Sequence, residues 1–457
     1  MDNFSSTAQL TPGHAEAGAS TPSGSRPDIQ QQAPEQSTGK KTSDFGALAH
    51  IVKSSLGSGI LAMPNAFRNG GLAFGLAATF IIGFICTYCV HLLVRASFVL
   101  AEEAKAVGGL DFAQTAQQAF ATGPAPLRKY ALAAKRFVNA ALLCTYYSVS
   151  CVYVVFISES LLQVVQHHAP DLGWGVRMYM LVLLPVLAVL CLPPTLRRLA
   201  PFSILANVCI FVGFAITLYY IFRQLPDFDR PLVAPPRQWP LYFSTVIFAL
   251  EGIGMVLPVA NNMKRPQHFL GCPGVLNVSM SIVVALYAII GFFGYLRYGN
   301  NTAGSITLNL PVAEPLAQAV KLLVAGAVLL TYGLLLFVPN SVVLEALGPK
   351  LPEHPTARSA CRVVFKLAVA CLSVGVAAAV PSLGPVISLV GAIFVSTLGL
   401  LCPAVIDTVM RWEKPGGLGR CRWRLLTNSF IVLMSLGALL TGTYTSVLEI
   451  KAEYTHS

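Results

Sequence analysis

Two stretches of this chain decide its fold: HIVKSSLGSGILAMPNAF at residues 50–67 and FALEGIGMVLP at residues 248–258. Each places a Gly-x-Gly triplet in the middle of an apolar segment, and each has a proline shortly afterwards, Pro64 and Pro258. In a helix interior glycine costs about 1 kcal/mol relative to alanine, and proline costs about 3 kcal/mol. Both segments are therefore predicted to be helices that break near their midpoints.

The composition around these stretches excludes a soluble globular protein. Hydrophobic residues make up 55% of the 457 residues and charged residues 11%, against roughly 25% charged residues in soluble domains. Apolar runs long enough to cross a hydrocarbon core of about 30 Å recur along the chain. We predict about eleven transmembrane helices, at residues 46–68, 71–95, 136–163, 178–194, 200–222, 241–262, 275–296, 316–340, 363–380, 383–407 and 425–448.

The segments outside the spans set the domain organisation and the orientation. Residues 1–44 are rich in Ser, Thr, Pro, Gln and Gly and lack an apolar run, a composition typical of disorder. Most of the 31 Lys and Arg residues lie in this tail and in alternate connections, which the positive-inside rule places in the cytoplasm. We predict a disordered cytoplasmic tail at 1–44, a transmembrane transporter domain at 45–449 and a short extracellular or luminal C-terminus at 450–457. Scattered basic residues also argue against nucleic-acid binding.

The two predicted breaks indicate a transport function. Unwound backbone at the membrane midplane is tolerated only where it is buried in protein or lines a cavity. The breaks occupy the first position of two successive sets of five spans, and an odd number of spans per set inverts the second set. This pattern predicts a secondary transporter with inverted repeats. The alternative is that the glycines only allow close helix packing.

The expected binding site uses backbone groups at the breaks. A half-helix starting near Gly59 would present unpaired N–H groups to an anionic group such as a carboxylate. Ser55 and Ser58 would add hydroxyls, and carbonyls freed in the sixth span would accept hydrogen bonds from an ammonium group. Such a site suits an amino acid. Tyr146 and Tyr147, in the third span, are candidate contributors to it.

Two titratable residues lie in the broken spans. Glu251 is the acid that we place near the middle of the membrane, where a charge is costly and usually functional. It could bind the substrate ammonium, carry a proton, bridge the broken helices or have a structural role. His50 precedes the first break by about two turns, and histidine titrates between pH 5 and 8 without perturbation. Its alternative is a helix-end residue without a role in transport.

Other motifs are absent from the sequence or point to the surface. There is no G-x-x-x-x-G-K-S/T, H-E-x-x-H or G-x-S-x-G motif, so we predict neither an ATP-driven pump nor an enzyme. We predict no catalytic residue, no metal site and no cofactor, with protons as the coupling ion. Asn300, in the sequon Asn300-Asn301-Thr302, falls on the predicted outer side and is expected to carry an N-linked glycan.

Four stretches resemble a known family: HIVKSSLGSGILAMPNAFRNGG, CVYVVFISESLLQVV, FALEGIGMVLPVANNMKRPQHF and GYLRYGNNTAGSITLNLP. They are similar to the proton-assisted amino acid transporters of the amino acid/auxin permease superfamily, from about residue 45 to the C-terminus. The resemblance implies an all-α, LeuT-like five-plus-five inverted repeat with broken first and sixth spans. It also implies symport of small neutral amino acids with a proton, at the plasma membrane or at lysosomal or endosomal membranes.

The resemblance assigns roles to individual residues. His50 stands where the family has a histidine implicated in proton coupling. The residues that match the family's two breaks are Gly57, Ser58 and Gly59, and Glu251, Gly252, Ile253 and Gly254. The chain departs from the family at Ala260, where a glutamate is usual, and this departure puts strict proton coupling in doubt. An endolysosomal amino acid sensor and an uncoupled amino acid facilitator are the two alternatives.

Overall fold

The computed structural model describes residues 41–55, 57–106, 109–193, 196–223, 229–250, 252–352, 354–414, 416–419 and 422–456. The regular structure of this part of the chain is helical, apart from one isolated β-bridge between Thr42 and Met263. In chain order the α-helices are α1 (Asp44–Ser55), α2 (Ser58–Gly70), α3 (Leu72–Glu103), α4 (Phe112–Thr122), α5 (Ala131–His168), α6 (Val176–Cys191), α7 (Leu196–Arg223), α8 (Trp239–Ala249), α9 (Ile253–Asn261), α10 (Val275–Tyr298), α11 (Pro315–Ala346), α12 (Pro355–Ala379), α13 (Leu383–Val390), α14 (Cys402–Arg411), α15 (Trp423–Gly437) and α16 (Thr443–His456).

The predicted polytopic, all-helical fold is confirmed. Within the described residues, nine helices are long and apolar enough to cross a membrane, and the bent pair α1 and α2 makes a tenth span. The apolar helix α6 is shorter and falls on the predicted fourth span. Large apolar side chains such as Phe84 and Leu433 are 73% and 69% exposed, which is the surface expected of a protein that faces lipid tails.

Both predicted breaks are present, and they occur at the glycines rather than at the prolines. The axes of α1 and α2 differ by 55° across a short gap. The sixth span is interrupted between Ala249, where α8 ends, and Ile253, where α9 begins. Pro64 and Pro258 lie inside α2 and α9. Each span is therefore interrupted at a glycine, and the proline is accommodated inside the half-helix that follows, about two turns later.

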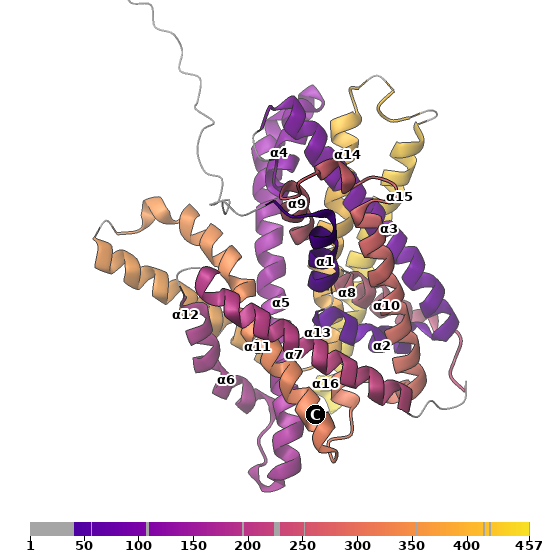
Figure 1. Ribbon diagram of the computed structural model, residues 1–457, viewed down its shortest axis with the longest axis vertical. Coiled ribbons are helices and arrows are strands. Elements are labelled where there is room, and N and C mark those ends of the chain that lie inside the picture. The colour runs from indigo at the N-terminus through magenta and orange to yellow at the C-terminus, as the bar shows by residue number, and fades with distance from the viewer. Residues whose placement is uncertain are drawn as a thin grey trace, which may run out of the picture. The chain divides into compact units, whose positions relative to one another are not determined.

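The two broken spans lie inside the bundle that residues 41–456 form (Figure 1). Helix α1 packs against α9 and α10, and α2 packs against α8, α10 and α3. Helix α13 also packs against α8, while α11 packs against both α5 and α7. The breaks are thus enclosed by protein, which satisfies the requirement for irregular backbone at membrane depth.

One helix was not anticipated from the sequence. Helix α4 lies in the connection between the second and third spans, where Asp111 and Gln114 form a capping box at its start. It packs on α5, α14 and α3. Helix α16 continues to His456, and residues 1–40 lie outside the described part of the chain. The boundaries proposed for the tail and the C-terminal segment remain predictions.

Candidate functional site

The backbones of the two broken spans touch at their breaks. A Cβ added to Gly59, in the first turn of α2, would lie 2.8 Å from Ala249 Cα and 2.9 Å from Ala249 O at the end of α8. Real Cβ atoms do not approach this closely, so only glycine permits the contact. The residue type that breaks the first span therefore also lets the second span come against it.

A tyrosine that sequence reasoning missed joins the two breaks. Tyr287, in the middle of α10, is fully buried, and its hydroxyl hydrogen-bonds to Ser55 O and lies 3.0 Å from Ala249 O. These carbonyls terminate α1 and α8, whose C-terminal ends carry partial negative charge. The hydroxyl has a single proton, which it shares between these two carbonyl oxygens. The available signal was a tyrosine within the apolar run VVALYAII at residues 283–290, because a buried Tyr hydroxyl needs a partner.

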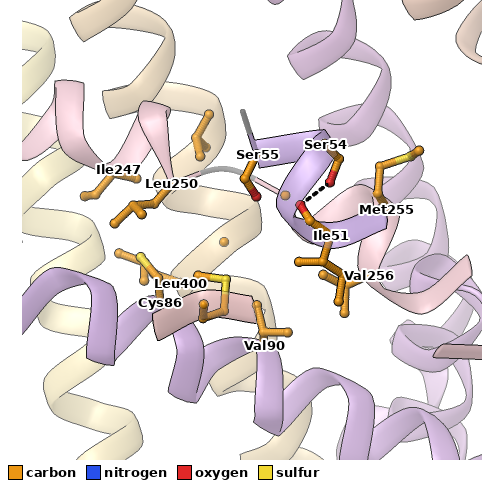
Figure 2. Close-up of a pocket in the computed structure, with 14 residues that line it drawn as sticks. Ile51, Ser54, Ser55, Cys86, Val90, Ile247, Leu250, Met255, Val256 and Leu400 are labelled. Carbon is orange, nitrogen blue, oxygen red and sulfur yellow. Dashed lines mark hydrogen bonds between the residues drawn. The ribbon is translucent and has the colours of Figure 1, made fainter. Parts of the chain in front are cut away.

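A pocket lies beside these breaks, between α1, α3, α8, α9 and α10 (Figure 2). It holds about 570 Å³ of empty space, part of it open to solvent. Its lining residues are mostly aliphatic or sulfur-containing: Ile51, Ser54, Ser55, Cys86, Val90, Ile247, Leu250, Gly252, Met255, Val256, Met280, Val395, Gly399 and Leu400. No charged side chain occurs among the described residues of this wall. Of the predicted binding residues, Ser55 and Gly252 contribute to it.

The helix ends at the breaks remain available to a zwitterion. The N-caps of α2 and α9 are Gly57 and Gly252, and neither provides a side-chain hydrogen bond to its helix. The first N–H groups of both half-helices thus lack side-chain caps and carry partial positive charge. The carbonyl of Ala249 retains accepting capacity beside Tyr287, since a carbonyl oxygen has two lone pairs, whereas Ser55 O already accepts from both Tyr287 Oη and Gly57 N. Donors for a carboxylate and acceptors for an ammonium group therefore occur within one neighbourhood.

The structure separates the two candidate tyrosines. A Cβ on Gly254, in the first turn of α9, would lie 2.7 Å from the hydroxyl of Tyr146. Tyr147 points elsewhere and donates to Asn340 Oδ1 on α11 at 3.2 Å. Adjacent residues of a helix project about 100° apart. Tyr146 is thus at the second break, and Tyr147 is not.

The remaining predicted residues have varied positions. Glu251 lies outside the described residues, and the side chains of Ser58 and Ile253 are also outside the description. Gly57 lines a separate apolar cavity with Lys53 on the opposite side of α1. His50 is exposed and is not part of the pocket wall. Its proposed role in coupling remains a prediction.

Asn300 lies away from these breaks. It is exposed in the short helical turn that follows α10. Thr302, the third residue of its sequon, is buried and donates to Gly299 O at 2.6 Å. The predicted glycan at Asn300 remains untested.

Ala260 occupies an apolar environment. It is fully buried near the end of α9, in a cluster that includes Leu93, Leu257 and Met410. A carboxylate in this packing would be removed from water among apolar neighbours, which is costly without a partner. The alanine at this position, where the family usually has a glutamate, is therefore compatible with the apolar side chains around it.

The ends of the broken spans farthest from the break are also joined. Thr42 N donates to Asn262 O and Lys264 N donates to Thr42 O, both at 2.9 Å. Beside this β-bridge, Asp44 Oδ2 and His268 Nδ1 are 2.7 Å apart. The start of α1 and the end of α9 must lose these contacts if the two half-helices separate on this side.

The chain is similar to known proteins along most of its length. Residues 40–448 match the family described as transmembrane amino acid transporter protein. Over 416 residues the chain is 38% identical to the proton-coupled amino acid transporter-like protein pathetic of Drosophila melanogaster, covering 91% of this chain and 87% of that protein. Over 418 residues it is 28% identical to the probable amino acid transporter skat-1 of Caenorhabditis elegans, covering 88% of each.

Similar solved structures include MhsT in complex with L-phenylalanine, with 14% identity and a TM-score of 0.49, covering 89% of this chain and 100% of that chain. A Na+-coupled sialic acid symporter has 11% identity and a TM-score of 0.41, covering 89% of this chain and 97% of that chain. The family assignment rests instead on the family match and the relative from Drosophila. On the strength of these two matches, this multi-pass membrane protein belongs to the transmembrane amino acid transporter family.

Proposed function

We propose that the protein moves small neutral amino acids across a membrane together with protons. The observation that carries the proposal is the pocket at the two breaks. It combines the uncapped N-terminus of α9, at Gly252, and the C-terminal end of α8, at Leu250, with a wall whose described side chains are uncharged. Backbone groups would bind the substrate's carboxylate and ammonium groups, while the apolar wall would favour a neutral side chain.

The proposed restriction to small substrates follows from the residues that line the same pocket. Gly252 and Gly399 line the pocket, whereas Met255, Met280 and Leu400 extend longer side chains into its boundary. Flexible methionines can adjust to ligands of similar size. Substrates with small aliphatic side chains would bury their surface here, while a charged side chain would lose water without gaining a described partner. The assay should therefore begin with glycine, alanine and proline.

Proton coupling is proposed on different grounds. The relative from Drosophila is named as proton-coupled amino acid transporter-like, and His50 matches the family position implicated in coupling. His50 lies on α1 five residues before Ser55, whose carbonyl bonds to Tyr287. Its protonation could thus bias the half-helix that ends at the site, as coupling requires. Glu251 is the second candidate proton carrier.

Reconstitution of the purified full chain in proteoliposomes tests the proposal. Labelled amino acid should accumulate above its external concentration when the outer solution is acidic, and a protonophore should abolish the accumulation. Equilibration without accumulation would replace symport with facilitated transport. Binding without flux would favour the sensor. The membrane, plasma or endolysosomal, would be assigned by imaging the tagged chain.

A variant pair tests the role of His50. We expect His50→Ala to lose pH-driven accumulation while retaining exchange of labelled for unlabelled substrate, because substrate binding does not use the imidazole. His354→Ala, at the exposed N-cap of α12, is the matched control and should behave like the wild type. Normal accumulation by His50→Ala would move the assignment to Glu251, for which Glu251→Gln should then abolish accumulation.

A further inference from the structure

A larger cavity lies between α3, α10, α14 and α15, outside the pocket described above. It holds about 1480 Å³ of empty space, part of it open to the surroundings. Its lining residues include Phe80, Phe84, Arg95, Asp407, Arg411 and Arg424. Met280 also lines the pocket at the breaks, so the two cavities share one side chain as a wall.

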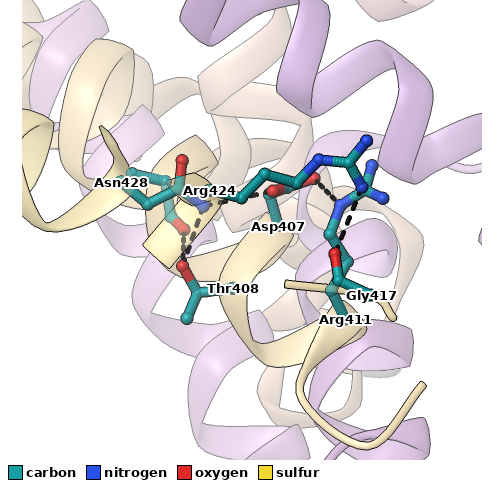
Figure 3. A network of polar contacts seen from close by, with 7 residues as sticks. Asp407, Thr408, Arg411, Gly417, Arg424 and Asn428 are labelled. Atoms are coloured by element: carbon teal, nitrogen blue, oxygen red, sulfur yellow. Dashed lines mark hydrogen bonds and ion pairs between the residues drawn. The ribbon is translucent and has the colours of Figure 1, made fainter. Parts of the chain in front are cut away.

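One end of this cavity is strongly basic. Three arginines line it against one carboxylate, Asp407. Arg411 donates through Nε to Asp407 Oδ1 at 2.6 Å, and Arg424 donates to Gly417 O at 3.1 Å (Figure 3). Arg95 is exposed and makes no hydrogen bond or ion pair with the described residues. Guanidinium donors thus remain available on all three side chains, because each carries five N–H groups.

The carboxylate is already committed within the protein. Asp407 is 1% exposed and accepts from both Arg411 and Asn428, the latter at 3.1 Å. Its negative charge therefore offsets Arg411 alone. Arg95 and Arg424 leave the cavity with a net positive charge, which favours an anionic ligand.

The other end of the cavity is apolar and faces outward. Phe80 and Phe84 are 49% and 73% exposed on α3. Phe84 precedes Arg95 by eleven residues, a rise of about 16 Å along a helix. The hydrocarbon layer of one leaflet is roughly half of the 30 Å core, or about 15 Å. The distance between the aromatic and basic ends thus matches the depth of one leaflet.

The basic end lies where anionic lipids are found. Arg95 is near the end of α3, Arg411 ends α14, and Arg424 is near the start of α15. The distribution of Lys and Arg predicts that all three face the cytoplasm. Trp423, beside Arg424, is 48% exposed, as is common at the membrane interface. The cytoplasmic leaflet carries anionic lipids that bind basic pockets between helices.

We propose that this cavity binds an anionic phospholipid from the cytoplasmic leaflet. The phosphate groups lie on the guanidinium groups of Arg95, Arg411 and Arg424, where paired N–H groups match phosphate oxygens. An acyl chain lies along Phe80 and Phe84. A soluble phosphate would fill only the basic end and would leave these aromatic side chains uncovered.

Binding of defined lipids to the purified full chain tests the site. The probe is phosphatidylinositol 4-phosphate, measured by native mass spectrometry against phosphatidylcholine of the same acyl composition. We expect at least tenfold tighter binding of the anionic lipid. Arg95→Gln should weaken it about fivefold, the effect of one basic residue near a membrane surface, and should leave phosphatidylcholine binding unchanged.

Two controls separate the alternatives. Arg362→Gln removes an exposed arginine on α12, away from the cavity, and should leave lipid binding unchanged. Inositol 1,4-bisphosphate and inorganic phosphate should not displace the lipid at equal concentration. Equal affinity for phosphatidylcholine, unchanged lipid binding by Arg95→Gln, or full displacement by either soluble phosphate would overturn the proposal. Arg95 has no described partner, so its replacement leaves no group in the fold unpaired.

Discussion

Replacing Tyr287 by phenylalanine removes one oxygen atom from the point where the two broken spans meet. The ring volume is preserved, so no cavity is created. The change deletes the hydroxyl that bonds to Ser55 O and lies 3.0 Å from Ala249 O. Ser55 O still accepts from Gly57 N at 2.8 Å, but the link from α10 to the ends of α1 and α8 is lost.

The magnitude follows from the value of one buried hydrogen bond. Its net contribution is about 1 kcal/mol, rising to roughly 2 kcal/mol when a partner is left buried without a donor. Since 1.4 kcal/mol is a factor of ten, the population of the conformation with joined breaks should fall roughly fivefold to thirtyfold. If transport passes through this conformation, Tyr287→Phe should lower the uptake rate by a similar factor.

A matched variant distinguishes this effect from a general loss of stability. Tyr332 is also fully buried, and its hydroxyl bonds to Ser373 Oγ at 2.6 Å between α11 and α12. Tyr332→Phe should cost a similar free energy of unfolding in mixed micelles but change uptake by less than about twofold. Wild-type uptake by Tyr287→Phe, or an equal loss in both variants, would refute the role of Tyr287 at the breaks.

Two further predictions test the packing. Gly59→Ala should lower uptake at least tenfold, because the added Cβ would overlap the Ala249 backbone. Gly57→Ala is the control and should retain uptake, because its Cβ would meet only Ser54 O, at 3.9 Å. Equal uptake by the two variants would contradict the close contact between Gly59 and Ala249. Asp407→Asn should cost about 3 kcal/mol of unfolding free energy, because Arg411, with an 11% exposed side chain, loses its carboxylate. Glu413→Gln, in an ion pair with Arg128 that is about half exposed, should cost less than about 1 kcal/mol; similar losses would show that burial does not set the difference.

Much of the architecture was predictable because its signals are local. Each predicted span falls on a helix, since a long apolar segment must satisfy its own backbone hydrogen bonds in lipid. The breaks at Gly57 and Gly252 follow from the low helix propensity of glycine. The prolines were weaker guides, because Pro64 and Pro258 lie within helices that continue past them.

The candidate site was less predictable. Ser55 and Gly252 reach the pocket wall as expected, but Ser54 and Cys86 also line it and were not assigned a role. Whether Tyr146 or Tyr147 faces a break depends on the rotation of α5, which its neighbours decide. A helix with apolar residues all around gives no periodic signal for that rotation.

By itself, the sequence determined that this chain is a polytopic membrane protein with two interrupted spans, because hydropathy and glycine content act over a few residues of chain. Only the tertiary structure decided which distant groups meet. It placed Tyr287 on the carbonyls of Ser55 and Ala249, and it gathered Arg95 with Arg411 and Arg424 in one cavity. These encounters join residues from different helices, and they depend on how the helices rotate and pack against one another.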